Sequence, residues 1–133
     1  MGIVDIFYAE INRVKDAKAD KEKQKVIARQ MVKKALLEFN LEWDLFRKSG
    51  KKGNWRSTAD SMLKEYAKLF ITVAVEINGI FTQEDINELR ELATEMSETV
   101  NILHIQGIGN EYKSKGDECA RKANELYRKF EAK

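Results

Sequence analysis

The fold is decided by residues 81–103, FTQEDINELRELATEMSETVNIL. Thr82 is a good helix N-cap, and acidic residues follow it in the first turn, where the helix dipole favours negative charge. Phe81 and Ile86 stand at the two positions of a hydrophobic staple. Beyond them, apolar residues recur at steps of three and four, which predicts a long helix with one buried face. That face consists of Ile86, Leu89, Ala93, Met96, Val100 and Leu103.

The same spacing predicts four further helices, over residues 3–17, 22–48, 57–77 and 110–133. Short loops between helices favour antiparallel neighbours. The sequence therefore predicts an all-α fold, an antiparallel up-and-down bundle of four to five helices that forms a single domain over 1–133. The second helix has the longest apolar stripe. It consists of Ala28, Met31, Val32, Ala35, Leu36, Phe39, Trp43 and Phe46.

Four local features bear on where the predicted helices begin, break or continue. The charged stretch 15–25, KDAKADKEKQK, is compatible with a helix or with a break. Residues 69–77 are apolar on nearly every side, which favours a helix buried from several directions, with a buried strand as the alternative. Gly116 interrupts the last helical segment, at a cost of ~1 kcal/mol relative to alanine. Ser57 with Asp60 resembles a capping box at the start of the third helix.

The chain has no proline, so nothing enforces a kink in its helices.

The composition also favours an intracellular protein. Cys119 is the only cysteine, which indicates a reducing compartment such as the cytoplasm. The first residues do not resemble a secretory signal, and the longest apolar run is far shorter than the ~20 residues that span a membrane. We therefore expect a cytoplasmic protein that does not enter a membrane.

Charge is divided unequally along the chain. Residues 1–64 contain 15 basic and 9 acidic side chains, and residues 65–133 contain 9 basic and 13 acidic ones. The loop 47–56 combines cations, glycines and a tryptophan, a pattern typical of contacts with a phosphate backbone. The alternative is a solvated turn whose tryptophan covers the core. The candidate binding residues are Arg47, Lys48, Lys51, Lys52, Trp55 and Arg56.

Carboxylates crowd the fourth helix, but their spacing does not favour a metal site. Glu88, Glu91, Glu95 and Glu98 each lie two residues after a stripe residue, or ~200° around the helix, and so face away from the core. His104 is the only histidine, and no nucleophile stands in a recognisable catalytic motif. We therefore expect no metal, no cofactor, no small-molecule substrate and no enzymatic activity.

The apolar segment 69–77 carries the functional prediction. Five short-looped helices do not readily cover every side of it, and uncovered apolar surface marks interfaces. The sequence therefore predicts a non-enzymatic helical protein–protein interaction module, of the small-subunit, adaptor or inhibitor type, with a protein partner or a homo-oligomer. The alternative is a nucleic-acid-associated protein that contacts phosphates through its basic first half and the loop 47–56. The candidate interface residues are Leu69, Ile71, Val73 and Val75.

Overall fold

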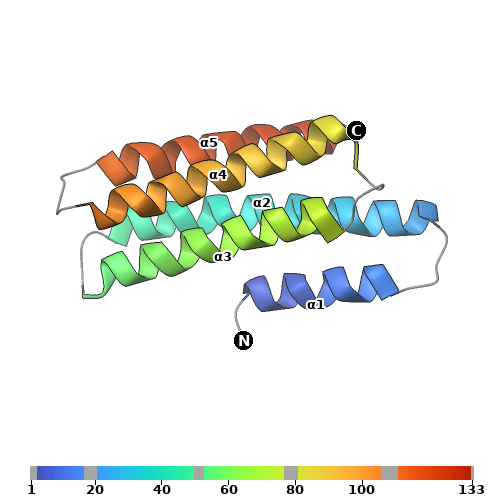
Figure 1. The fold of residues 1–133 in the computed structure, drawn as a ribbon, viewed down its shortest axis with the longest axis horizontal. Helices are drawn as coiled ribbons and strands as arrows, with labels where there is room; N and C mark the ends of the chain where they lie inside the picture. Colours follow the sequence, from blue (N-terminus) through green and yellow to red (C-terminus); the bar gives the residue numbers. More distant parts are fainter. Residues whose placement is uncertain (1–2, 17–20, 50–52, 77–80, 106–110, 133) are drawn as a thin grey trace.

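The computed structural model describes residues 3–16, 21–49, 53–76, 81–105 and 111–132. These residues form five α-helices, which confirms the predicted all-α fold (Figure 1). The helices are α1 (Ile3–Asp16), α2 (Lys21–Ser49), α3 (Trp55–Glu76), α4 (Gln83–His104) and α5 (Glu111–Ala132).

Helices α2 to α5 form an up-and-down bundle in which neighbours in the chain run antiparallel (Figure 1). Helix α3 packs on α4, α4 packs on α5, and α5 closes the ring by packing along α2. Helix α1 lies outside this ring and packs across α2 and α3. Among the described residues it contacts neither α4 nor α5. The antiparallel arrangement that the short loops predicted is therefore present, with α1 as an added arm.

The core is built from the stripes that the periodicity predicted. All six stripe residues of α4 are buried, and so are all the stripe residues of α2 except Phe46, which is half-buried. Aromatic rings join the helices across the centre. Phe39 of α2 meets Tyr66 of α3 edge to face, with ring centroids 5.3 Å apart.

The start of α4 has the predicted cap. The Thr82 hydroxyl accepts a hydrogen bond from the backbone N–H of Asp85, at 3.2 Å. Phe81 and Ile86 are both buried, as the staple requires. The Phe81 ring also packs edge to face on Phe130, with centroids 5.8 Å apart, which joins the start of α4 to the end of α5.

The predicted start of α3 at Ser57 is wrong by two residues. The helix begins at Trp55, and the Asn54 carbonyl accepts a hydrogen bond from the Thr58 N–H at 2.9 Å. The physical reason is a distant contact: the Trp55 ring packs against Tyr112 of α5, with centroids 5.2 Å apart, and holds this turn on the bundle. Ser57 therefore lies inside the helix rather than at its cap.

Two further predictions can be compared with the described residues. Residues 69–76 lie within α3, so the strand alternative is wrong for them. In the charged stretch 15–25, residues 15–16 end α1 and residues 21–25 begin α2. Residues 17–20, and position 77, lie outside the described residues.

Gly116 does not interrupt α5, contrary to the prediction. It is buried within the helix, directly against the indole ring of Trp43 on α2, where an added Cβ would overlap the ring. The indole N–H of Trp43 donates a hydrogen bond to the neighbouring Asp117 carboxylate, at 2.8 Å. Glycine is therefore needed here for the close approach of α5 to α2.

Candidate functional site

The cations of the 47–56 loop are partly engaged within the chain. Arg47 forms an ion pair with Asp117 of α5, at 3.3 Å, and Lys48 pairs with Asp44 one turn earlier in α2, at 2.9 Å. Lys51 and Lys52 lie outside the described residues. The described end of α2 therefore presents cations that are already partly neutralised.

Trp55 does not project freely from this loop. It is half-buried against Tyr112, and the Arg56 guanidinium lies over its ring, 5.1 Å from the centroid. The indole thus takes part in both a ring–ring contact and a cation–π contact. This geometry resembles the alternative expectation, in which the tryptophan covers the core.

The predicted interface segment of α3 is divided between core and surface. Leu69 and Val73 are buried in the bundle, whereas Ile71 and Val75 are exposed. The two exposed residues are one turn apart, and no exposed large hydrophobic residue of α3 other than these is described. The structure therefore leaves a small apolar patch on α3 rather than an uncovered helix.

The acidic residues of α4 form ion pairs with lysines of α5. Lys129 contacts both Glu84 and Glu88, and Lys122 contacts Glu95. The hydrogen bonds that Lys129 donates to Glu84 and Glu88 raise the pKa of this lysine. The described residues contain no group of three His, Cys, Asp or Glu side chains that could hold a metal ion. These carboxylates join two helices along their solvent edge.

His104 and Cys119 also have structural contacts. His104 at the end of α4 lies 3.0 Å from the Asp60 carboxylate of α3. Partial burial raises the pKa of Asp60, but hydrogen bonds with Lys64 and His104 outweigh this effect and hold the pKa below its ordinary value. Cys119 is buried, and burial raises the pKa of its thiol to about 11, so it is a poor nucleophile.

The most conspicuous surface feature was not predicted. Leu37, Leu41 and Leu45 of α2 are 40%, 52% and 68% exposed. They are spaced by four residues, so they share one face of the helix, roughly opposite the core stripe that contains Phe39 and Trp43. Helix α2 is therefore apolar on two faces, and only one of them is covered. We call this second face the outer face of α2.

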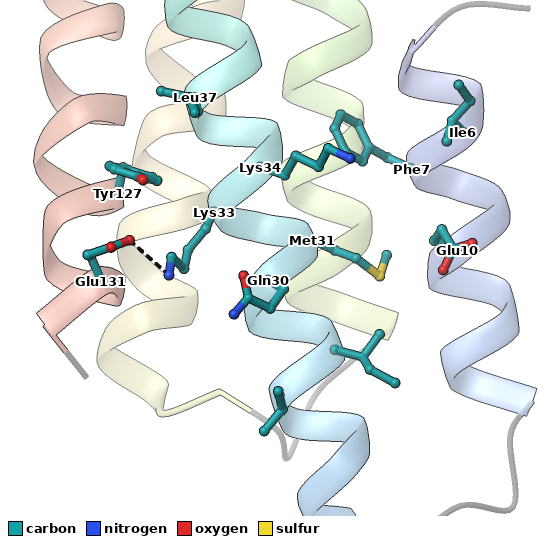
Figure 2. A pocket seen from close by; sticks show the side chains of 12 residues that line it. Ile6, Phe7, Glu10, Gln30, Met31, Lys33, Lys34, Leu37, Tyr127 and Glu131 are labelled. Atoms are coloured by element: carbon teal, nitrogen blue, oxygen red, sulfur yellow. Dashed lines mark ion pairs between the residues drawn. The ribbon is translucent and has the colours of Figure 1, made fainter.

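The outer face continues into a groove at the N-terminal half of α2 (Figure 2). Helix α2 forms its floor, α1 forms one wall and α5 forms the other. The groove has a volume of about 790 Å³, and its apolar lining includes the exposed Ile6 and Val26 beside Leu37. It is large enough to accept side chains from another helix.

The polar side chains of the groove are mostly paired already. Lys33 on the floor forms an ion pair with Glu131 on the α5 wall, at 2.9 Å, and this contact lowers the pKa of Glu131. Glu10 on the α1 wall pairs with Arg13, at 2.7 Å. Lys34 extends towards α1, and no ion pair joins it to another described residue (Figure 2). The groove therefore combines a mostly apolar lining with a cation, Lys34, that has no ion pair within the described residues.

A signal for the outer face exists in the sequence. The leucines at 37, 41 and 45 have the same helical spacing as the core stripe, and each lies between core positions. A second apolar stripe on one helix indicates a second covered face. The groove walls carry no such signal, because they depend on where α1 and α5 pack.

Comparisons with known proteins identify no relative of this chain. No protein-family model, no curated protein and no solved structure matches this chain. Within the described residues, no helix has the length and hydropathy needed to cross a membrane. The outer face of α2 is therefore the candidate site on the physical grounds given above.

Proposed function

We propose that this chain is a non-enzymatic protein–protein interaction module, and that it binds its partner through the outer face of α2. The observation that carries the proposal is the exposed row Leu37, Leu41 and Leu45, which leads into the groove between α1 and α5. A continuous row of exposed apolar side chains is typical of an interface, because covering it releases ordered water.

The chemistry of the groove supports binding rather than catalysis. Its charged side chains are mostly engaged with one another, Lys33 with Glu131 and Glu10 with Arg13. A mostly apolar groove between two helical walls suits the apolar face of an inserted helix. A cytoplasmic location is part of the proposal, and the single buried thiol of Cys119 supports it.

A photo-crosslinking amino acid in place of Leu41 tests the proposal in cells. We expect crosslinks from this position to another protein chain, and loss of these crosslinks when Leu45→Glu is added. The matched control carries the same crosslinker in place of Ser61, an exposed residue of α3. If neither position gives an adduct, or both give the same ones, the outer face of α2 is not a binding surface.

Nucleic acid binding stays a prediction of the sequence. It requires that the cations of the 47–56 loop reach phosphates, although Arg47 and Lys48 are paired within the chain. Binding to a nucleic acid would weaken strongly between ~50 and ~200 mM salt. It would also be lost in a variant with Lys51→Gln, Lys52→Gln and Arg56→Gln. No binding at low salt would exclude this alternative.

A further inference from the structure

We infer that the partner of the outer face of α2 is a second copy of this chain, with the two α2 helices antiparallel across a two-fold axis. The inference rests on the proposed function and identifies the partner. It depends on two properties of α2: its two halves differ in shape, and they differ in charge. A two-fold axis between two copies brings each half against the other half of its partner.

The shapes of the two halves are complementary. The N-terminal half of α2 is the floor of the groove, because α1 lies beside it as a wall (Figure 1). The C-terminal half of α2 extends past the described part of α1 (Figure 1), and its Leu41 and Leu45 are exposed. One half is therefore hollow and the other protrudes.

An antiparallel pair centred near residue 36 fits each protruding half into a groove. Residues equally distant from this centre meet across the axis. Leu45 then lies at the level of Ile27 of the second copy, and Leu41 at the level of Met31. A two-fold axis makes each of these contacts twice, so both grooves are filled and both pairs of leucines are covered. A parallel pair would place leucines on leucines and leave both grooves empty.

The charges follow the same symmetry. Lys33 and Lys34 lie in the groove half of α2, whereas Glu38 and Glu42 lie in the protruding half. Lys34 and Glu38 are equally distant from residue 36, so the axis brings Lys34 of each copy to Glu38 of the other. Neither residue has an ion pair with another described residue, although they are one turn apart in the same helix. The antiparallel arrangement therefore gives both an oppositely charged neighbour.

Sedimentation equilibrium of the purified full chain is the first test. We expect a dimer at about 100 μM, because interfaces of ordinary size have dissociation constants that are micromolar or lower. Leu45→Glu is expected to raise the dissociation constant by at least about 30-fold, the effect of a central apolar contact. Ile71→Glu is the matched control: it introduces the same charge at the exposed patch of α3 and is expected to leave the dimer intact.

A charge exchange tests the antiparallel register. Lys34→Glu alone and Glu38→Lys alone each place like charges together twice, and each is expected to weaken the dimer about tenfold. An equimolar mixture of the two variants restores both opposite-charge contacts, so it is expected to form a heterodimer as tight as the wild type. A merely local effect on the helix would not be reversed by mixing.

Three results would overturn the inference. The first is a wild-type protein that is monomeric at this concentration. The second is a dimer that Ile71→Glu disrupts but Leu45→Glu does not, and the third is a mixture of the Lys34→Glu and Glu38→Lys variants that fails to form the heterodimer. Circular dichroism of each variant confirms that it is folded. A monomer in solution whose position 41 still crosslinks to a different protein in cells would overturn only the identity of the partner. A monomer without any such crosslink would overturn the proposed function as well.

Discussion

At the scale of single residues, the contact between Gly116 and Trp43 closely constrains how α5 packs on α2. We expect Gly116→Ala to destabilise the protein by about 2 kcal/mol, because the added methyl group overlaps the indole ring and overpacking outweighs the gain in helix propensity. Urea denaturation of the variant measures this loss.

The double variant Gly116→Ala with Trp43→Leu is the control for this interpretation. A smaller side chain at position 43 removes the overlap, so the two changes together should cost clearly less than the sum of the two single changes. Additive losses would mean that the glycine is needed for some reason other than the indole ring.

Asp60 gives a prediction for the dependence of stability on pH. Its pKa is lower in the folded protein than in the unfolded chain, where it is ~3.9, because Lys64 and His104 are hydrogen-bonded to it. As the pH falls, the Asp60 carboxylate therefore takes up its proton in the unfolded chain at a higher pH than in the folded protein. The stabilisation is present above about pH 5 and is lost as the pH falls below ~4.

We expect Asp60→Asn to remove this component, about 0.5–1 kcal/mol at neutral pH. The free energy of unfolding of the variant should then fall less steeply between pH 5 and pH 3 than that of the wild type. Chemical denaturation at several pH values measures both slopes. Glu65→Gln, an exposed change on the same helix, is the control. Equal slopes for Asp60→Asn and the wild type would contradict the assignment.

At the scale of helices, the N-cap of α4 is the clearest local determinant. Thr82→Ala removes the acceptor for the Asp85 N–H and is expected to cost about 1 kcal/mol of stability. Thr94→Ala is the matched control, since Thr94 is exposed within the same helix and its hydroxyl bonds only to the backbone of Arg90. Thermal denaturation should show a lower melting temperature for Thr82→Ala alone.

Helix boundaries were predictable where the determinants are local. Thr82 and its neighbours contain the whole start signal of α4, and that prediction is confirmed. The start of α3 depends on the contact of Trp55 with Tyr112, which is distant in the chain, and there the local capping pattern at Ser57 misled the prediction. Gly116 is similar, because its neighbour Trp43 lies on another helix.

The candidate site was predictable only in part, for the same reason. The leucines at 37, 41 and 45 form a readable stripe, but one stripe on α2 was enough to account for the core. The segment 69–77 is apolar all round and was therefore predicted to be an interface. In the structure, α3 buries Leu69 and Val73 of this segment within the bundle. The groove itself depends on the packing of α1 and α5, which no local pattern encodes.

At the scale of the whole molecule, α1 is the least integrated helix. Among the described residues it packs only on α2 and α3, whereas the other four helices form a closed ring. Phe7 is its buried anchor, and the Tyr8 hydroxyl bonds to Thr72 of α3 at 3.3 Å. A helix that lies outside the ring and packs on only two of the other helices, as far as the structure describes them, opens at a lower free energy than the core. We therefore expect the amides of α1 to exchange with deuterium faster than those of α2 to α5.

Phe7→Ala separates this arm from the bundle. The substitution removes the anchor, a change that costs ~3–5 kcal/mol for a buried phenylalanine, so the amides of α1 should lose nearly all their protection. The amides of α4 and α5 should keep theirs, because α1 does not touch these helices in the described structure. Tyr8→Phe, which removes one hydroxyl contact, should have a much smaller effect. Hydrogen exchange measured by mass spectrometry resolves the helices. An equal loss of protection in all five helices would show instead that α1 unfolds together with the bundle as a single cooperative unit.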